Sequence, residues 1–367
     1  MATSPTNKRS LLKNLLKGSV KTSSQSQSYT SPLENGNRQV TQEDIERFLD
    51  MAVNGPHSSY QFNALYQLQI RREAEEEQQY STEAGRKASD YNLNRYPAIL
   101  PYDYSRIRLI PTDLTYSDSA DYINASEVYT PDTHRRYIAT QGPRGNTIQD
   151  FWRMVWDNVS PSKENTVSAI IMLTQTREGQ WSKCAQYWPE PGRSPFQVPY
   201  RNKEGEDITL DVRLVSQETN DETDAVISTI EISSREKEAT SNLTPRYTIK
   251  HMLYTGWRDM EAPISTDKFL NFFRLYRNIH TSSAAPIVHC SAGCGRTGVF
   301  IALDYLFTKV PSMTKEQILE DPVFKTVNEI RKWRAWLVFK PDQLHFIYEL
   351  FEKMASDKLQ MPEMQIE

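Results

Sequence analysis

The chain has 367 residues, of which 38% are hydrophobic and 25% charged, with a formal net charge of -4 at pH 7. This composition is typical of a globular protein, and the length allows one large α/β domain or several smaller ones. The slight negative charge gives no general attraction to nucleic acid, so we expect no nucleic-acid partner and only a local anion site. No apolar run approaches the roughly 18 residues of a membrane span, so we expect a soluble protein.

The three cysteines are an odd number, which cannot build a disulfide framework and argues against structural zinc. Free thiols persist in a reducing compartment. We therefore expect a cytoplasmic protein, with the nucleus as a second location.

Residues 1–40 are rich in Ser, Thr, Asn, Gln and Lys, and we expect a disordered basic tail. Within it, residues 8–17 could form a short basic amphipathic helix, so a docking peptide or a membrane-surface contact stays open beside a solvated tail. Thr41 can cap a helix with acidic residues in its first turn. We expect the folded domain to span residues 41–355, followed by a short C-terminal tail at 356–367.

Helical and strand-like patterns alternate through this domain. Helical spacing at Phe62, Leu65 and Tyr66 runs into the charged stretch 71–77, which we expect to be a solvated helix face. Short β-like runs between residues 107 and 215 predict a sizeable sheet, and the polar stretch 217–242 predicts a long hairpin or a surface insertion. Two apolar helical stripes should be core: Phe269, Phe272, Phe273 and Tyr276, and Leu344, Ile347, Tyr348 and Phe351.

Residues 286–290 predict a buried strand, 291–296 a tight loop of small residues, and 297–303 a helix. Such a loop can turn several N–H groups inward, and the helix dipole adds positive charge, so a tetrahedral dianion would fit. Cys290 begins the loop, and Arg296 closes it with a fork suited to phosphate oxygens. A helix end lowers a thiol pKa by at most about 1.5 units, so the N–H groups and Arg296 must supply the rest. The alternative is an inert core thiol.

The string from His289 to Gly298, His-Cys-Ser-Ala-Gly-Cys-Gly-Arg-Thr-Gly, is the signature of cysteine-dependent phosphatases, and it resembles the tyrosine-specific, non-receptor branch. The resemblance extends over about residues 41–353. It implies one α/β domain, a highly twisted mixed β-sheet flanked by helices, with Cys290 at the base of a cleft. Its other motifs are Asn94-Arg95-Tyr96, residues 121–126, residues 137–143 and Gln186-Tyr187-Trp188-Pro189.

The resemblance also implies roles at the reaction centre. Cys290 is the expected nucleophile, which forms a phosphocysteine, and Asp259 in the segment after Trp257 is the expected general acid. Thr297 would assist thiolate departure, and His289 would organise the loop by hydrogen bonding. The phosphate would be held by Arg296 and by the loop residues Ser291, Ala292, Gly293, Cys294 and Gly295.

Further residues would support this centre by the same resemblance. Tyr96 would flank the substrate ring and make the pocket deep enough to favour phosphotyrosine over phosphoserine. Glu178 would brace Arg296, and Lys183 would contact the loop of the general acid. Cys294 is expected to pack, with a reversible bond to Cys290 under oxidation as a minor hypothesis.

The sequence departs from the family pattern at four positions. Arg258 replaces the usual Pro beside the general acid, and Ala98 replaces an Asp that grips the peptide backbone. Trp336 stands where Gly often keeps the cleft open. Phe339 stands where a Gln positions the hydrolytic water, and Gln343, which matches a second family Gln, is the candidate substitute. If it does not substitute, hydrolysis of the phosphocysteine should be slow.

The sequence therefore predicts a monomeric protein tyrosine phosphatase that needs no cofactor or metal. Its partners would be phosphotyrosine-containing proteins, with kinases of a signalling cascade as the family-level expectation. Two alternatives stay open: a phosphotyrosine-binding pseudophosphatase of reduced turnover, suggested by Arg258, Ala98 and Phe339, and a dual-specificity phosphatase, which Tyr96 and the long N-terminal half disfavour.

Overall fold

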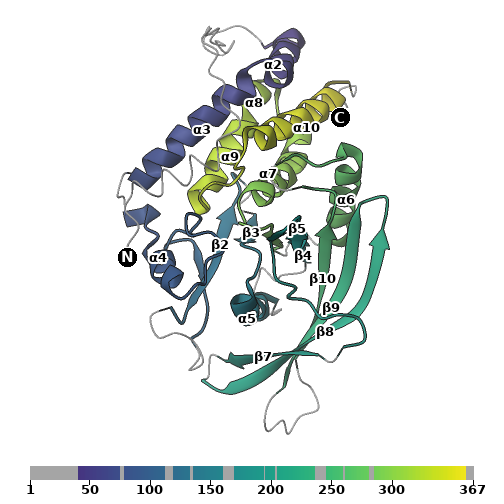
Figure 1. Cartoon of the computed structure of the whole chain (residues 1–367). Coiled ribbons are helices and arrows are strands. Elements are labelled where there is room, and N and C mark those ends of the chain that lie inside the picture. Colours follow the sequence, from purple (N-terminus) through teal and green to yellow (C-terminus); the bar gives the residue numbers. More distant parts are fainter. Residues whose placement is uncertain are drawn as a thin grey trace, which may run out of the picture.

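The computed structural model describes residues 40–74, 78–111, 119–132, 135–159, 169–193, 195–202, 205–235, 245–258, 261–280 and 285–360 (Figure 1). Asp259, residues 1–39 with the expected helix at 8–17, and residues 361–367 lie outside this part of the chain. The helices are α2 (Gln42–Asn54), α3 (His57–Ala74), α4 (Glu83–Asp90), α5 (Ile148–Val159), α6 (Thr266–Ile279), α7 (Gly295–Lys309), α8 (Lys315–Leu319), α9 (Pro322–Trp333) and α10 (Pro341–Gln360).

A mixed sheet of nine strands runs through the molecule in the order β1-β2-β3-β11-β4-β10-β9-β8-β7. Its strands are β1 (Arg106–Arg108), β2 (Tyr122–Tyr129), β3 (Arg136–Thr140), β4 (Ala169–Met172), β7 (Phe196–Arg201), β8 (Asp207–Asn220), β9 (Ala225–Arg235), β10 (Arg246–Tyr254) and β11 (Ile287–His289). A separate hairpin joins β5 (Arg177–Glu178) to β6 (Trp181–Ser182). β11 is parallel to both its neighbours, β3 and β4, and the outer pairs β1–β2, β2–β3 and those from β10 to β7 are antiparallel.

Helices cover both faces of the sheet centre. Successive strand residues point to opposite faces, so neighbouring residues of one strand enter different cores. Val288 and Ile171 join the core under α2, α6, α7, α9 and α10, while their neighbours Ile287 and Ile170 join the core under α5. Figure 1 shows most of these helices gathered at one end, while β7 and the adjoining ends of β8 and β9 lie at the other. The predicted fold class, a mixed sheet flanked by helices, is confirmed.

The predicted helix N-terminus at Thr41 is also confirmed. The Thr41 hydroxyl accepts a hydrogen bond from the Asp44 backbone N–H, and the Asp44 carboxylate accepts one from Thr41 N–H, so the pair forms a capping box at α2. Both apolar stripes predicted as core are buried in α6 and α10, and residues 217–235 belong to the β8–β9 hairpin.

Two expectations need correction. The stretch from residue 71 is not simply a solvated face: Arg72 donates to Asn328 of α9, and the Glu73 carboxylate accepts from Trp336 at 2.7 Å. The segment expected to be a tail from residue 356 is helical in its described part, because α10 continues to Gln360.

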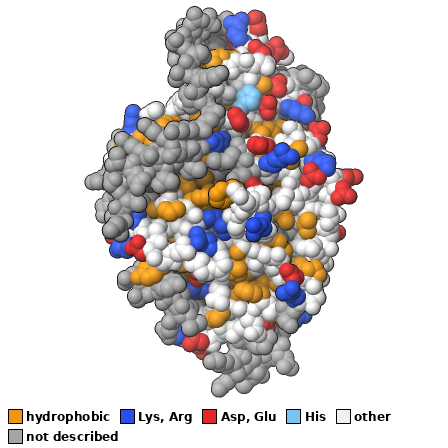
Figure 2. All heavy atoms as spheres, in the orientation of Figure 1, with side chains coloured by type: hydrophobic (Ala, Val, Ile, Leu, Met, Phe, Trp, Pro, Cys, Tyr) orange, Lys and Arg blue, Asp and Glu red, His pale blue; other side chains and the backbone are white. Residues whose placement is uncertain are grey.

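On the face shown in Figure 2, acidic and basic side chains lie interspersed among polar and apolar ones. Within the described ranges no helix is both long and apolar enough to cross a bilayer.

Candidate active site

The loop between β11 and α7 is shaped by two close backbone approaches. Gly293 has a positive φ of 70°, and a Cβ there would lie 2.1 Å from the carbonyl oxygen of Thr140, so only glycine fits. A Cβ on Gly298, in the first turn of α7, would lie 2.3 Å from Val338 N. The loop is thus pressed between the end of β3 and the turn that precedes α10.

Every carbonyl from Cys290 to Cys294 accepts a hydrogen bond from a group outside the loop. The donors, in that order, are His289 Nδ1 at 3.1 Å, Gly142 N at 2.9 Å, Arg334 Nη2 at 3.2 Å, Arg334 Nε at 2.7 Å, and Gly298 N at 2.9 Å with Val338 N at 3.1 Å. In a trans peptide the C=O and the next N–H point in opposite directions. The N–H groups of residues 291–295 therefore turn toward the inside of the loop, where together they make an anion-binding concavity.

Cys290 and Arg296 occupy the two ends of this loop and are both buried, 4% and 2% exposed. Arg296 Nη1 donates to Glu178 Oε1 at 2.8 Å and to the carbonyl oxygen of Trp257 at 3.0 Å. The carboxylate thus holds the guanidinium in one orientation, the geometry expected of a brace. The structure brings Glu178, Trp257 and Cys290 to one place from three distant parts of the sequence.

The segment that should carry the general acid begins at Trp257, whose ring is buried and whose indole N–H donates to the Glu261 carbonyl at 2.7 Å. The neck of the segment is closed by a hydrogen bond from Ile264 N to the Gly256 carbonyl at 2.9 Å. Arg258 is exposed. Since Asp259 lies outside the described residues, its role as acid stays a prediction.

Tyr96 is half-buried beside the loop, with its hydroxyl 3.0 Å from Ser291 Oγ, which in turn donates to the Lys183 carbonyl at 2.9 Å. Arg95 fixes this region by donating to the carbonyls of Gly142 and Pro143 at 3.0 and 2.7 Å. A ring entering the loop would therefore pass the side of Tyr96. The contact expected between Lys183 and the acid segment stays a prediction, because residues 259–260 lie outside the described residues.

Thr297 is fully buried, and its hydroxyl has no hydrogen-bond partner among the described residues, so it is available to a group held in the loop. Gln343 also lies beside the loop: a Cβ on Gly295 would be 2.9 Å from its Nε2. Its Oε1 accepts from Phe339 N at 3.0 Å and Lys340 N at 3.3 Å, which leaves the amide N–H₂ as its free donor side.

The turn before α10 forms one wall of the site. Trp336 and Val338 have positive φ values of 63° and 59°, which only glycine adopts without strain. Trp336 is held there by its indole bond to Glu73 and by the ring of Tyr66, with centroids 5.6 Å apart. Cys294 and Phe339 pack into the same buried cluster, which fits the packing role expected of Cys294.

The β5–β6 hairpin places an apolar side chain at the rim. Glu178 and Trp181 are cross-strand partners, so their side chains lie on the same face of the hairpin. Glu178 reaches Arg296 from that face, while Trp181 is 65% exposed. Sequence reasoning did not single out Trp181; an aromatic residue in a short polar hairpin was the available signal.

Sequence reasoning also missed Arg334, which is fully buried and binds two loop carbonyls together with Ser126 Oγ and Asn124 Oδ1 at 3.1 and 2.7 Å. Burial lowers the pKa of this guanidinium. The signal available in the sequence was that Arg334 stands between the apolar residues Trp333 and Ala335, where an exposed charge is not expected.

Burial fixes the protonation of two side chains near the loop. It raises the pKa of the Cys184 thiol to about 12, so that thiol stays protonated and unreactive at neutral pH. It also lowers the pKa of His289 to about 4, so the ring before Cys290 is neutral. In the described part of the chain, no group of three or more His, Cys, Asp or Glu side chains could hold a metal ion.

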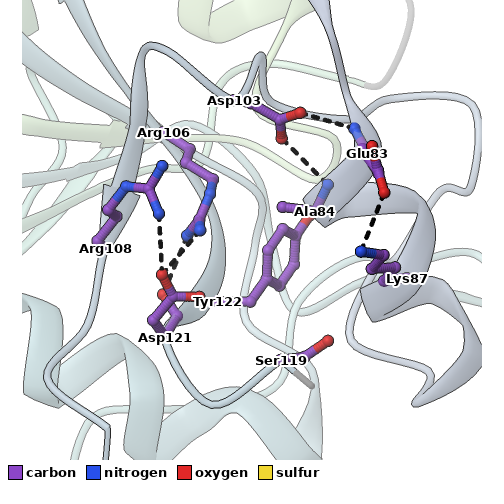
Figure 3. A pocket seen from close by; sticks show the side chains of 9 residues that line it. All are labelled: Glu83, Ala84, Lys87, Asp103, Arg106, Arg108, Ser119, Asp121 and Tyr122. Atoms are coloured by element: carbon purple, nitrogen blue, oxygen red, sulfur yellow. Dashed lines mark hydrogen bonds and ion pairs between the residues drawn. The ribbon is translucent and has the colours of Figure 1, made fainter.

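A second hollow of about 420 Å³ lies between α4, β1 and β2, away from this loop (Figure 3). Its charged side chains already have partners: Asp121 binds Arg106 at 2.7 Å and Arg108 at 3.2 Å, Glu83 binds Lys87 at 2.9 Å, and Asp103 accepts from the N–H groups of Glu83 and Ala84. It contains none of the side chains predicted for catalysis. The anion-binding loop at Cys290 is therefore the candidate active site.

A cysteine and an arginine at the two ends of an inward-facing loop define the site of a cysteine-dependent phosphatase. The family model described as protein-tyrosine phosphatase matches residues 90–353. This chain therefore belongs to the protein-tyrosine phosphatase family, which confirms the resemblance seen in the sequence.

Among curated relatives, Tyrosine-protein phosphatase 1 of Schizosaccharomyces pombe is 33% identical over 292 residues, covering 77% of this chain and 48% of that protein. Tyrosine-protein phosphatase non-receptor type 2 of Rattus norvegicus is 33% identical over 288 residues, covering 77% of this chain and 59% of that protein. The chain thus spans about half the length of these relatives. A solved structure described as "Structural basis of PTPN18 fingerprint on distinct HER2 tyrosine phosphorylation sites" matches with a TM-score of 0.66 and 26% identity, covering 85% of this chain and 99% of that one.

Proposed function

We propose that this chain is a protein tyrosine phosphatase that hydrolyses phosphotyrosine in proteins through a phosphocysteine at Cys290. The observation that carries the proposal is the outward engagement of every carbonyl from Cys290 to Cys294, which turns five N–H groups toward one anion beside the thiol. A site that only bound phosphate would not need a cysteine at its base. The tyrosine-protein phosphatases named among the relatives support the same activity.

In the first step, Cys290 Sγ as thiolate attacks phosphorus, and the bond from phosphorus to the phenolic oxygen breaks. The loop N–H groups and Arg296 stabilise the equatorial oxygens of the transition state. The departing phenolate has a conjugate-acid pKa near 10, so a proton from Asp259 should accelerate departure by about 10²–10⁴. Glu178 keeps Arg296 oriented throughout.

In the second step, water attacks phosphorus and the bond from phosphorus to sulfur breaks, which releases phosphate and restores the thiolate. The unpartnered hydroxyl of Thr297 is the donor that can stabilise this sulfur. Phe339 cannot orient the water, because its side chain offers no polar atom. The amide N–H₂ of Gln343, which lies beside Gly295 of the loop, is the candidate substitute, and without the family's Gln at 339 we expect this step to limit turnover.

Specificity for phosphotyrosine follows from the depth at which Cys290 lies. Cys290 is buried, and Tyr96 lines the approach to it through its contact with Ser291. The aromatic spacer of phosphotyrosine reaches such a sulfur, whereas the short side chain of phosphoserine does not. Ala98 offers no carboxylate to a peptide backbone, so affinity should rest on the ring and the phosphate.

The proposal is tested with an aryl phosphate and a phosphotyrosyl peptide. Wild type should hydrolyse both, Cys290→Ser should be inactive, and Asp259→Ala should lose about 10²-fold or more in kcat. Asp267→Ala, which removes an acid from the first turn of α6, is a control for general effects of charge. Hydrolysis that survives in Cys290→Ser would overturn the assignment.

Slow hydrolysis of the intermediate predicts a burst of released phenol in rapid-mix kinetics, equal to one equivalent of enzyme, with phosphocysteine recovered by acid quench and mass analysis. Phe339→Gln should raise the steady rate and diminish the trapped adduct. A linear progress curve with no adduct would refute slow dephosphorylation, while tight binding of phosphopeptide without any turnover would indicate a binding protein instead.

A further inference from the structure

A chain of three buried side chains lies directly behind the nucleophile. The Tyr187 hydroxyl is 2.8 Å from His251 Nε2 and 2.7 Å from His289 Nε2, and His289 Nδ1 is 3.1 Å from the carbonyl oxygen of Cys290. All three side chains are buried: each residue is at most 1% exposed. The histidines come from β10 and β11, and Tyr187 from the segment between β6 and β7.

The direction of every hydrogen bond in this chain follows from one fixed acceptor. A carbonyl oxygen only accepts, so His289 Nδ1 carries the hydrogen that points to Cys290. In a neutral ring, Nε2 is then an acceptor, and it takes the hydrogen of the Tyr187 hydroxyl. The hydroxyl oxygen in turn accepts from His251 Nε2–H. The other neighbour of this hydroxyl, Met172 Sδ at 3.9 Å, is too far and too weak an acceptor to compete.

The end of the chain provides an independent check. This assignment leaves His251 Nδ1 with a lone pair and no hydrogen, and Nδ1 is indeed without a partner in the described part of the chain. The reversed chain would bury an unpaired N–H there and would set two acceptors, His289 Nδ1 and the Cys290 carbonyl, 3.1 Å apart. Both faults cost more than an unused lone pair.

Charged rings are excluded by their surroundings. Burial is the main cause that lowers the pKa of His289 to about 4, and the cations Arg95 and Arg296 lower it further. Burial also lowers the pKa of His251 to about 3, aided by His289. Both rings are therefore neutral at physiological pH, as the assignment of single hydrogens requires.

We propose that Tyr187 and His251 are positioning residues of the active site, which hold the Cys290 peptide through donors aligned as His251 to Tyr187 to His289 to the Cys290 carbonyl. Aligned hydrogen bonds polarise and strengthen one another in a low-dielectric interior. Because this carbonyl is the first of those turned outward, its fixation sets the direction of Ser291 N–H, the first donor of the anion-binding loop. A residue on β10, remote in sequence, thereby helps to orient the catalytic loop.

The tautomers can be read directly by long-range ¹H–¹⁵N correlation spectra of protein labelled at histidine, at pH 7 and without substrate. We expect His289 to carry its hydrogen on Nδ1 and His251 on Nε2. Two rings with the same tautomer, or an imidazolium at either position, would overturn the proposed direction of these hydrogen bonds. This measurement needs no catalytic activity, so it can fail while the proposed phosphatase activity stands.

The effect of Tyr187 and His251 on catalysis rests on the proposed phosphatase activity and is tested by paired variants. Tyr187→Phe should lower kcat for an aryl phosphate by about tenfold, as expected for one lost buried hydrogen bond, and should mix the tautomers of His289. Tyr200→Phe is the matched control, because its hydroxyl donates to Asp157 at 2.6 Å away from the loop. Equal kcat in these two variants would overturn the role of Tyr187.

His251 is tested by replacing its donor with another one. In His251→Gln the amide can still donate to the Tyr187 oxygen, whereas in His251→Leu nothing can. We expect the glutamine variant to keep kcat and the His289 tautomer within about twofold of wild type, and the leucine variant to lose several-fold in kcat. If the leucine and glutamine variants behave alike, His251 does not orient the hydrogen bonds of Tyr187 and His289.

Discussion

Replacing Arg334 with methionine should lower kcat by more than the loss of folded protein explains. Met is apolar and of similar length, so it fills the space but leaves the carbonyls of Ala292 and Gly293 without their donors. Each buried acceptor left unpaired costs about 1–3 kcal/mol. Part of this loss is offset, because the guanidinium of Arg334 is buried among neutral acceptors in the described residues, and its removal also removes its desolvation cost. We therefore expect the free energy of unfolding to fall by about 1–3 kcal/mol.

Catalysis should fall even in the folded protein, because two of the five peptides that face the phosphate lose their anchors. Removal of a single oxyanion donor typically costs about 10²–10³ in kcat, so we expect kcat for an aryl phosphate to fall by about 10². The assay is steady-state hydrolysis beside urea unfolding of the same preparations. Arg334→Lys, which keeps the charge but not the fork, should lie between wild type and Arg334→Met.

Arg331→Met is the matched control. Arg331 is also fully buried, but it donates to the carbonyls of Leu337 and Val338 at 2.7 and 2.6 Å rather than to the loop. It should lose comparable stability with a smaller loss of kcat. If both variants lose activity only in proportion to the unfolded fraction, or if Arg334→Met is as active as wild type, then the outward carbonyls do not govern catalysis.

Three other predictions concern the rim, the wall and the buried histidines. Trp181→Ala should raise KM for phosphotyrosyl peptides and leave an aryl phosphate unaffected, because an exposed indole at the rim can contact only residues beside the phosphotyrosine; equal changes for both substrates would contradict this. Trp336→Gly relieves a positive φ but removes a buried ring and its bond to Glu73, so urea unfolding should show a net loss of about 2–4 kcal/mol; a stabilised variant would contradict it. His251 and His289 have folded pKa values of about 3 and 4 against the ordinary 6.5, so the unfolded chain binds protons first. Their contribution is complete above pH 6.5 and should be lost below it by about 1.4 kcal/mol per pH unit for each ring, and flat stability between pH 7 and 5 would refute this.

Sequence alone determined the parts of this protein that depend on neighbours along the chain. The capping pair Thr41 and Asp44, the apolar stripes of α6 and α10, and the succession of strand, loop and helix around Cys290 are local patterns. Cys290 and Arg296 belong to the same short loop, so their approach needed no knowledge of the fold.

Tertiary structure decided everything that depends on contacts between distant segments. Glu178 meets Arg296 across more than a hundred residues, and Arg334 reaches the loop carbonyls from the turn before α10. The direction of the hydrogen bonds from His251 to Cys290 required three side chains brought together from the sheet and an adjoining segment. Such pairs leave no periodic trace in a sequence, because hydrogen-bond geometry is fixed by packing and not by spacing along the chain.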